Sequence, residues 1–568
     1  MNKYVIICLC FVVSSCQNKQ GSSKKKIDYK SQWVDSIYND MTLEEKIGQL
    51  FMVAAYSNRD TAHSDSIKKM IQTHHLGGLV FFQGSPFKQA NLTNDYQSIS
   101  KTPLLIGIDA EWGVNMRLDS TFRYPYNMTL GAVQDSNLIK KVGIQIGKHC
   151  KRLGIHVNFA PVVDINTNPN NPIIGVRSYS EDKKNVATKA IAFTKGLQSE
   201  GVLACAKHFP GHGDTDKDSH KTLPTISFSA QRIDSVELYP FKQLFNNGIA
   251  SVMVAHLNVP SLEKTQGLPS SLSHHITSKV LKESLGFKGI IFTDALNMKG
   301  ATNYKNPGDI DLAAFEAGND VLLLSENIPK ATYKLIEAYK HNRFSEERLS
   351  YSVKRILSAK FEVNLHKYEP VNISNLKNDL NTIDDEILYN TVISKAITLV
   401  KNEHSYIPIA KDYNKKIAYL KFGSGKSNEF LSTLKSYAKV DELPISRSKK
   451  LLKKLKKYDL IIIGYHRSNT RKINQFDKNE SLLIEEIAKN NKVILDVFAS
   501  QYTLTKLSFV NLESVMISYE NSKSSQKASA QIIFGDKEVI GKLPASINLE
   551  FQTDHGIEIP ISSSQVSN

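Results

Sequence analysis

The stretch VLACAKHFPG, residues 202–211, decides how the first half of the chain folds. It is an apolar run of β-forming residues that turns polar at Lys207 and His208 and is broken by Pro210 and Gly211. A short apolar run bounded by proline and glycine is typical of a buried strand. The stretch is therefore predicted to be a strand that carries polar groups at its carboxyl end.

Seven other runs of this kind occur in the first half of the chain, and segments with helical periodicity fill most of the gaps between them. Strands that alternate with helices indicate a parallel sheet with crossover connections. Eight such units in about 320 residues predict an α/β fold, a (β/α)8 TIM-like barrel. The seven runs are GQLFMVAA (48–55), GGLVFF (77–82), PLLIGIDAEWG (103–113), VNFAPVVDIN (157–166), SVMVAHLNV (251–259), GIIFTDALN (289–297) and DVLLLSEN (320–327).

Polar residues gather where these runs end. In a barrel the carboxyl ends of all strands meet at one face, where barrel enzymes place their active sites. The chain is therefore predicted to carry one cup-shaped site at that face. The strand-end residues are Asp109, Glu111, Asp164, Asn166, Lys207, His208, His256, Asn258 and Asp294.

The second half of the chain predicts another domain. Residues 366–390 are polar and are predicted to be a linker that contains the start of a helix. Apolar β-like runs then resume and a helix-like segment follows, which predicts a smaller α/β domain over 391–568. The barrel is assigned to 31–365, after a signal peptide over 1–16 and a flexible tether over 17–30. The β-like runs cover 396–402, 416–423, 458–466, 492–500 and 513–520, and the helix-like segment covers 524–535.

The N-terminus resembles a bacterial lipoprotein signal. An apolar run over 4–13 follows Lys3 and is too short to span a bilayer. Residues 13–16, Val-Ser-Ser-Cys, resemble a lipobox, which implies cleavage before Cys16 and lipidation of that cysteine. Gln17 in place of Asp favours the outer membrane, so the protein is expected to be a membrane-anchored lipoprotein that faces the periplasm. A plain secretory signal is the alternative.

The net charge of +16 does not by itself identify a partner. Such a balance suits an anionic partner, but the positive charge is scattered. Its densest run, SKKLLKKLKK (448–457), spaces its leucines along one helical face, which favours a solvated amphipathic helix over a binding patch. No nucleic-acid-binding motif occurs in the sequence, so no nucleic-acid partner is expected.

The loop after the opening strand, KHFPGHGDTDKDSH (207–220), is crowded with titratable groups. His208 and His212 have the spacing of two metal ligands on a helix, but the proline and glycines around them exclude a helix. Acid/base chemistry fits better, because Asp218 and His220 are two residues apart and a carboxylate beside an imidazole raises its proton affinity. A solvated polar loop is the alternative.

The stretch FTDALNMKG (292–300) places Asp294 at the end of another strongly apolar strand. An aspartate at the mouth of a barrel is suited to be a nucleophile or a base. The alternative is that Asp294 caps the segment after it, because aspartate is a good helix N-cap.

Four motifs together carry a resemblance to a known family. They are KHFPGHGDTDKDSH, GFKGIIFTDALNMKGA (286–301), NPIIGVRSYSED (171–182) and IDAEWGVNMR (108–117). With them the chain resembles glycoside hydrolase family 3 and, within it, the bacterial β-N-acetylglucosaminidases. The resemblance is strong over 35–365 and weaker over 385–545, where AQIIFGDKEVIGKLPASI (530–547) looks like the family's C-terminal α/β sandwich domain.

This resemblance implies a role for each matching residue. Asp294 matches the nucleophile, and His220, paired with Asp218, matches the general acid/base. The implied reaction is retaining hydrolysis of a terminal β-GlcNAc from peptidoglycan fragments or related oligosaccharides, with no cofactor and no metal. The residues matched to sugar binding are Asp109, Arg117, Arg177, Lys207 and His208.

The chain departs from the family's motif at Trp112, where the family usually has glycine. A bulky ring there is expected to narrow or reshape the entrance for the substrate. Three other functions are left open by the sequence. The first is a family 3 β-glucosidase or xylosidase, which would not need Asp218 and His220, and the second is a non-catalytic sugar-binding lipoprotein with the same barrel. The third is a structural protein that anchors peptidoglycan, which only the predicted lipid and the basic charge suggest. The sequence does not determine the oligomeric state.

Overall fold

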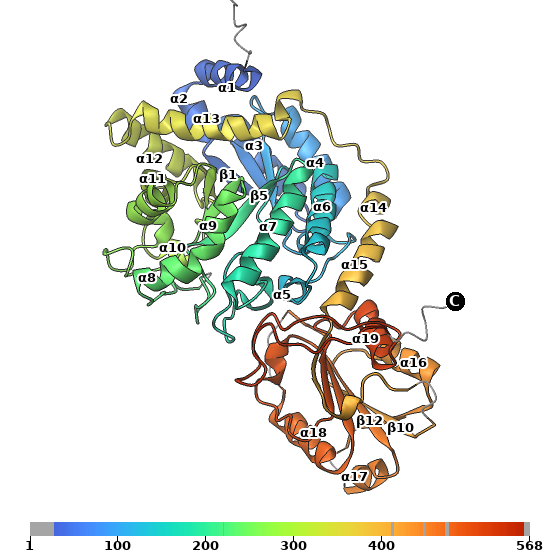
Figure 1. The fold of residues 1–568 in the computed structure, drawn as a ribbon. Helices are drawn as coiled ribbons and strands as arrows, with labels where there is room; N and C mark the ends of the chain where they lie inside the picture. Colours follow the sequence, from blue (N-terminus) through green and yellow to red (C-terminus); the bar gives the residue numbers. More distant parts are fainter. Residues whose placement is uncertain (1–27, 220, 411–413, 447–448, 472–475, 562–568) are drawn as a thin grey trace, which may run out of the picture.

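The computed structural model describes residues 28–219, 221–410, 414–446, 449–471 and 476–561. The chain forms two units, an eight-stranded barrel and a domain built on a six-stranded sheet. The segment between them holds α14 (Leu376–Asp379) and α15 (Ile383–Ala396). Figure 1 shows this segment in yellow-orange, running along the barrel to the orange and red second domain.

The first unit confirms the predicted parallel barrel. Its strands follow the order β7-β6-β5-β4-β3-β2-β1-β8, and all their pairings are parallel. The barrel closes where Val321, just before β8, bridges Phe292 of β7. The strands are β1 (Phe51–Tyr56), β2 (Gly78–Phe82), β3 (Leu105–Ile108), β4 (Val157–Asn158), β5 (Leu203–Phe209), β6 (Ser251–Val254), β7 (Ile290–Thr293) and β8 (Leu322–Leu323).

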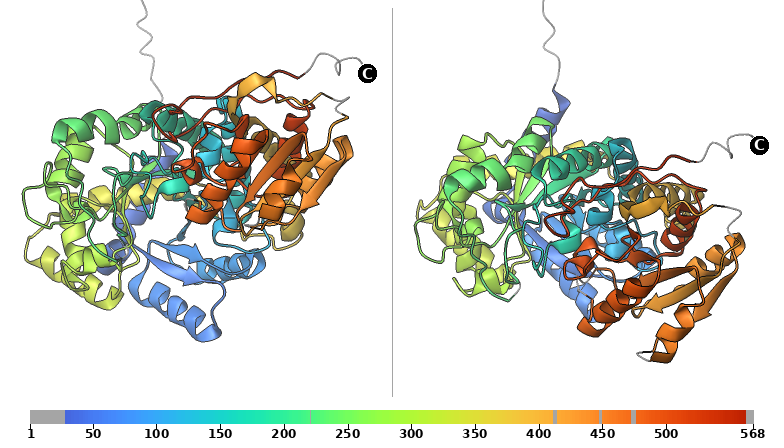
Figure 2. Two further views of the ribbon diagram at one scale, coloured as in Figure 1. Left: turned by 90° about the horizontal axis from the view of Figure 1, so that it is seen from below. Right: turned by 60° about the horizontal axis from the view of Figure 1, so that its bottom comes forward.

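Helices surround these strands, so the strands are buried on both sides. All seven residues of β5 are buried, which explains why its sequence is a continuous apolar run and not an alternating one. Figure 2 shows the helices from two further directions, with the second domain next to the cyan and teal part of the barrel. The barrel helices are α1 (Tyr29–Asp40), α2 (Leu43–Gly48), α3 (Thr61–His74), α4 (Pro86–Ser98), α5 (Asn127–Gly131), α6 (Ser136–Arg152), α7 (Lys183–Ser199), α8 (Ala230–Arg232), α9 (Tyr239–Asn246), α10 (Lys299–Thr302), α11 (Asp309–Ala317), α12 (Ile328–Lys340) and α13 (Glu346–Glu362).

The second unit is a mixed sheet in the order β11-β10-β12-β13-β14-β9. Its strands pair in parallel except β9, which runs antiparallel to β14 at one edge. All five predicted runs are strands. The sequence did not predict β11, an edge strand with two exposed central residues and hence a short apolar signal. The elements are β9 (Thr398–Asn402), β10 (Ile417–Phe422), α16 (Asn428–Tyr437), β11 (Val440–Leu443), α17 (Lys449–Leu455), β12 (Leu460–His466), α18 (Lys478–Asn490), β13 (Val493–Phe498), β14 (Ser514–Ile517) and α19 (Lys523–Ile533).

The lysine-rich run forms the amphipathic helix α17, as predicted over its described part. Leu451 and Leu455 are buried, whereas Lys453 and Lys454 are exposed. The positive charge of this run therefore lies on a solvated helix face.

Buried polar contacts hold the second domain against the barrel. The Glu520 carboxylate accepts hydrogen bonds from Arg123 Nη1 and from the backbone N–H of Tyr126, both at 2.7 Å. Burial opposes the charge of Arg123, but Glu520 outweighs it and raises the pKa of the guanidinium. Asn166, in the loop after β4, donates to the Tyr502 hydroxyl at 2.8 Å. The interface therefore lies beside the carboxyl-end loops of the barrel.

The predicted lipoprotein segment lies outside the described residues, and so does Cys16. Within residues 28–561, apart from the four gaps, no helix is long and apolar enough to cross a membrane. The lipid anchor stays a prediction from the sequence.

Candidate active site

A cavity of about 240 Å³ opens at the carboxyl ends of the barrel strands. It collects side chains from distant parts of the sequence, including one from the second domain. Asp294 and all five residues predicted to bind the sugar lie on its walls. The polar lining residues are Asp109, Glu111, Arg117, Arg177, Lys207, His208, His212, Ser219, Asp294 and Arg471.

Lys207, at the end of β5, joins the two acids that follow β3. Its Nζ lies 2.7 Å from Asp109 Oδ1 and 2.9 Å from Glu111 Oε1. Arg117 Nη2 contacts the other oxygen of Asp109. Lys207 and Glu111 are almost fully buried, at 2% and 1% exposure. Charges at such depth are tolerated only because each has an opposite charge beside it.

This pairing reverses the effect of burial on both acids. Burial alone would raise the pKa of Asp109, but Lys207 and Arg117 outweigh it and hold that pKa well below its usual value. Burial also opposes the charge of Glu111, yet Arg177 and Lys207 lower its pKa to about 2. Near neutral pH both carboxylates are therefore ionised and accept hydrogen bonds without donating any.

Arg177 binds the Glu111 carboxylate through two hydrogen bonds. Its Nε donates to Oε2 at 2.9 Å and its Nη2 donates to Oε1 at 2.7 Å. The Ile173 carbonyl accepts a further hydrogen bond from Nη1 at 3.3 Å. A bidentate contact fixes the plane of the guanidinium, so Arg177 is oriented before any ligand arrives.

His208 is oriented by Asp164, which lies in the loop after β4. The ring Nδ1 donates to Asp164 Oδ2 at 2.7 Å, and the His208 backbone N–H donates to Oδ1 at 3.2 Å. These contacts place the ring proton on Nδ1 and turn Nε2 toward Arg177 Nη2, 3.5 Å away. Burial opposes the charge of Asp164, but His208 outweighs it and lowers the pKa of this acid.

His212 does not act with His208 as a pair of metal ligands. Its Nδ1 lies 2.7 Å from Thr215 Oγ1 and its Nε2 lies 3.0 Å from Ser219 Oγ. Burial and the neighbouring His208 lower the pKa of His212 to about 4, so the ring is neutral at pH 7. Both ring nitrogens are thus engaged by hydroxyl groups, and the ring holds the loop together.

Two glycines let this loop fold back across the strand ends. A Cβ on Gly213 would lie 1.8 Å from the carbonyl oxygen of Ile165, so no other residue fits there. Gly211 has a φ of +131°, in the left-handed region that strains residues with side chains. The close approach brings His212 and Ser219 to the cavity.

Asp294 follows β7 directly and is half-buried on the cavity wall. Its backbone N–H donates to the Val254 carbonyl at 2.8 Å, and its Oδ1 accepts from the Ala295 N–H at 2.8 Å. The next helix, α10, begins only at Lys299 and has Met298 as its N-cap residue. The alternative that Asp294 is a helix N-cap is therefore wrong.

The structure describes the predicted acid/base pair only in part. Asp218 is half-buried and is not among the described residues that line the cavity, although its neighbour Ser219 is. The Asp218 carbonyl accepts the backbone N–H groups of Lys221 and Thr222, each at 3.0 Å. His220 lies outside the described residues. The pairing of Asp218 with His220 stays a prediction.

Sequence reasoning placed Glu111 and Asp164 at the polar face of the barrel but gave them no role, and it left Arg471 out of the predicted site. The two acids carried a signal, because both end apolar strand runs. Their roles as partners of Arg177 and His208 became visible only in three dimensions. Arg471 carried no signal, because it lies in the second domain, outside every barrel motif.

Trp112 does not line the cavity in the described part of the chain. Its side chain is 6% exposed and packs edge-on against Tyr126, with ring centroids 5.0 Å apart. Arg471 lies over the indole, 5.3 Å from the ring centroid. The expected narrowing by the ring itself is therefore not observed, and Trp112 shapes the rim by supporting Arg471.

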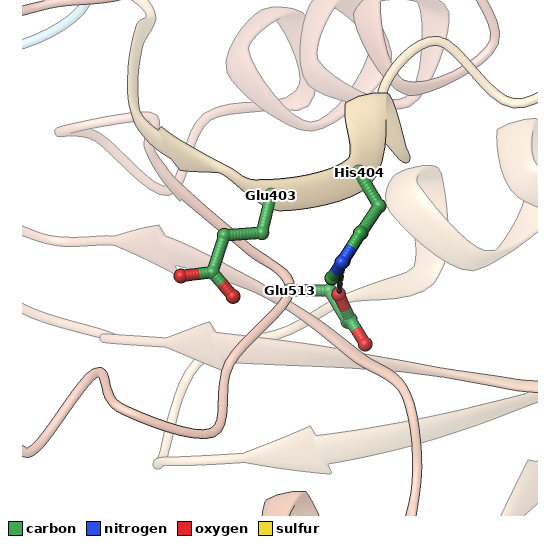
Figure 3. Close-up of side chains that lie close together, drawn as sticks. All are labelled: Glu403, His404 and Glu513. Carbon is green, nitrogen blue, oxygen red and sulfur yellow. Dashed lines mark hydrogen bonds and ion pairs between the residues drawn. The ribbon is translucent and has the colours of Figure 1, made fainter.

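A second group of ligating side chains lies at an edge of the second domain. Glu403, His404 and Glu513 place one ligand atom each within 4.8 Å of one another (Figure 3). His404 Nδ1 lies 3.0 Å from Glu513 Oε2, and Glu403 pairs with Lys401 at 3.0 Å. Glu403 and His404 are exposed, and their existing partners account for the cluster without an ion. It therefore carries no assignment as a metal site.

The fold and the cavity together define a class of protein. A small cavity with many fixed donors and acceptors suits a ligand that is rich in hydroxyl and amide groups. Asp294 among them supplies a carboxylate that is able to act as a nucleophile. Polar groups gathered at the carboxyl ends of the strands are the arrangement typical of the active site of a barrel enzyme.

Comparison with known proteins identifies the family. Residues 42–359 match the Glycosyl hydrolase family 3 N terminal domain. The chain is 34% identical over 326 residues to beta-hexosaminidase A of Pseudoalteromonas piscicida. The aligned residues cover 52% of this chain and 54% of that protein. It is 32% identical over 278 residues to a beta-hexosaminidase of Nitrosomonas eutropha, covering 47% of this chain and 78% of that protein.

A solved structure extends the similarity to both domains. The glycoside hydrolase family 3 beta-N-acetylglucosaminidase from Paenibacillus sp. strain FPU-7 superimposes with a TM-score of 0.74 and 31% identity, over 90% of this chain and 99% of that one. The present chain spans about half the length of the Pseudoalteromonas relative. The protein belongs to glycosyl hydrolase family 3, as its motifs predicted, and its relatives include β-hexosaminidases.

Proposed function

We propose that the protein is a retaining exo-β-N-acetylglucosaminidase, which releases a terminal β-GlcNAc from oligosaccharides. The observation that supports this most is the cavity, in which Asp294 and the five residues predicted to bind the sugar line one space of about 240 Å³. A space of this size suits one sugar residue held by many hydrogen bonds. The relatives named beta-hexosaminidase and beta-N-acetylglucosaminidase support the same sugar.

In the proposed reaction, Asp294 is the nucleophile and His220 is the general acid and base. The Asp294 carboxylate attacks the anomeric carbon and forms a glycosyl ester, while His220 protonates the departing oxygen. His220 then deprotonates a water molecule, which attacks the same carbon and releases Asp294. Two inversions retain the β configuration. Asp218 is proposed to orient His220, as a carboxylate partner orients a catalytic imidazole.

The ion-pair network is proposed to hold the sugar. Ionised Asp109 and Glu111 accept hydrogen bonds from hydroxyl groups, whereas Lys207, Arg117 and Arg177 donate to hydroxyl and acetamido oxygens. Because these groups are already fixed by one another, the sugar is positioned with little reorganisation of the protein.

The proposed natural substrates are peptidoglycan-derived fragments with a terminal β-GlcNAc. The predicted lipid on Cys16 supports this, because it would place the enzyme at the outer membrane, facing the periplasm. Radiolabelled palmitate should label the wild-type protein but not Cys16→Ser. Labelling of Cys16→Ser, or none in the wild type, would contradict the anchor and leave the catalytic proposal standing.

The catalytic proposal is tested by hydrolysis of nitrophenyl β-GlcNAc and nitrophenyl β-glucose. Wild type should prefer the GlcNAc substrate, and Asp294→Ala and His220→Ala should each lose about 10³-fold or more in kcat. Asp216→Ala is the matched control, because it removes an exposed carboxylate from the same loop and should keep full activity. NMR of the reaction should show that the GlcNAc released first is the β-anomer.

Three results would contradict this proposal. Preference for glucose would favour the β-glucosidase alternative. Full activity in His220→Ala would remove His220 from the mechanism. Sugar binding without turnover in the wild type would favour a non-catalytic sugar-binding lipoprotein.

A further inference from the structure

Arg471 brings the second domain to the active site. Among the cavity-lining residues that the structure describes, it alone comes from that domain. Its side chain is exposed, and its guanidinium lies over the indole of Trp112, 5.3 Å from the ring centroid. A cation over an indole face is attracted by the ring's π-electrons. Arg471 is therefore positioned at the rim by a barrel residue.

The support beneath Arg471 is part of the interface between the domains. Trp112 packs edge-on against Tyr126, and the Arg123 guanidinium lies over the Tyr126 ring, 4.2 Å from its centroid. The buried Glu520 carboxylate of the second domain binds both Arg123 and the Tyr126 backbone. The contact that joins the domains therefore also fixes the ring on which Arg471 rests.

Arg471 differs from the other cations of the cavity in its acidic partners. Lys207, Arg117 and Arg177 each contact Asp109 or Glu111. For Arg471, the described part of the chain contains no ion pair within 4.0 Å. A guanidinium stacked on an aromatic ring keeps its N–H edge available for a planar anion. The rim thus presents a positive charge with no described protein anion beside it.

We propose that Arg471, seated on Trp112, is a specificity residue that recognises a carboxylate on the sugar next to the GlcNAc that is released. This inference rests on the proposed function. A carboxylate matches a guanidinium through two parallel hydrogen bonds, which a neutral sugar at the same place does not offer. The enzyme is therefore expected to favour a carboxylated disaccharide over its neutral counterpart.

Two disaccharides test this with the full-length chain. GlcNAc-β-1,4-MurNAc and chitobiose both release GlcNAc, but only the first carries a lactyl carboxylate on the neighbouring sugar. Wild type should show a kcat/KM at least about tenfold higher on the carboxylated one. Arg471→Gln should reduce that ratio by about tenfold, mainly through KM, and Arg471→Lys by less, since lysine lacks the two-point contact.

The matched control is Lys478→Gln, which removes one positive charge from an exposed position of the same domain and should keep the wild-type ratio. High salt should lower the ratio in wild type and in Lys478→Gln, but not in Arg471→Gln. An unchanged ratio in Arg471→Gln, or no preference in wild type, would overturn the role of Arg471 and leave the proposed function standing. Failure of wild type to hydrolyse both disaccharides and nitrophenyl β-GlcNAc overturns the proposed function and this inference with it.

Discussion

Glu111 in the barrel and Asp496 in the second domain are both fully buried carboxylic acids, yet their surroundings have opposite effects. Glu111 lies between Arg177 and Lys207, and these cations outweigh burial and lower its pKa to about 2. Burial raises the pKa of Asp496 to about 7, because its side-chain partners are the hydroxyl groups of Ser518 and Ser529.

The comparison separates the roles of the two domains. Burying a charge costs free energy unless an opposite charge lies beside it, and hydroxyl partners do not remove that cost. The barrel buries charged groups together at one end, where the proposed substrate binds, which is typical of a functional site. The second domain instead buries an acid that has no described cation beside it, and this acid keeps its proton up to about pH 7.

The largest effect is expected when the charge of Lys207 is removed from the ion-pair network of the barrel. Lys207→Met leaves Asp109 and Glu111 without their shared cation, and it should lower the free energy of unfolding by about 3–5 kcal/mol. Lys360→Met is the control, because Lys360 is also buried but donates to the Gln49 amide at 2.6 Å. The control should change stability by no more than about 1 kcal/mol in urea unfolding at pH 7.5. Equal losses would show that burial of the lysine stem matters more than its charge.

The second expected effect concerns pH. Burial raises the pKa of Asp496 from its ordinary value of 3.8 to about 7. Between these two pH values the folded protein keeps the Asp496 proton, whereas the unfolded protein has lost it. The stability contributed by protonated Asp496 is therefore complete below the unfolded pKa and is lost as pH rises toward 7. From pH 5 to pH 7, the unfolding free energy of wild type should therefore fall by about 2.3 kcal/mol relative to that of Asp496→Asn.

Urea unfolding of the two proteins across this pH range checks that value. Ser436→Ala, an exposed hydroxyl elsewhere in the domain, controls for loss of a polar group. A difference that stays constant with pH would mean that Asp496 is ionised in the folded protein, like Glu111.

A smaller effect is expected at the interface. Glu520→Gln removes the negative charge beside half-buried Arg123 but keeps an acceptor, and it should lower the free energy of unfolding by about 1–3 kcal/mol. Glu558→Gln is the matched control, because Glu558 pairs with Lys542 at 2.7 Å on the surface. Such exposed pairs contribute about 0–1 kcal/mol. A loss for Glu558→Gln as large as that for Glu520→Gln would contradict a special role for the buried contact.

The smallest expected effect is that of metal ions on the cluster of Glu403, His404 and Glu513. Calcium, zinc or EDTA should shift the Tm of wild type and of Glu513→Gln equally, because existing contacts within the protein account for this cluster. Metal binding to the folded state alone would raise the Tm. A rise in wild type that Glu513→Gln abolishes would establish a metal site at this edge.

The sequence by itself determined the barrel and most of its polar end. Apolar runs broken by glycine and proline predicted all eight barrel strands, and the polar residues that end them placed Lys207, His208 and Asp294 at one face. These features are local, because burial on both sides of a parallel sheet demands continuous apolar runs and parallel strands end at a common edge.

Only the tertiary structure decided which charged groups are partners. Glu111 binds Arg177 across 66 positions of sequence, and Arg471 reaches Trp112 from another domain. No local pattern carries such information, because these pairs depend on how the loops fold back and how the domains pack. The pKa of each buried acid follows from those partners, so the buried carboxyl of Glu111 is ionised at the barrel mouth, whereas that of Asp496 stays protonated up to about pH 7 in the core of the second domain.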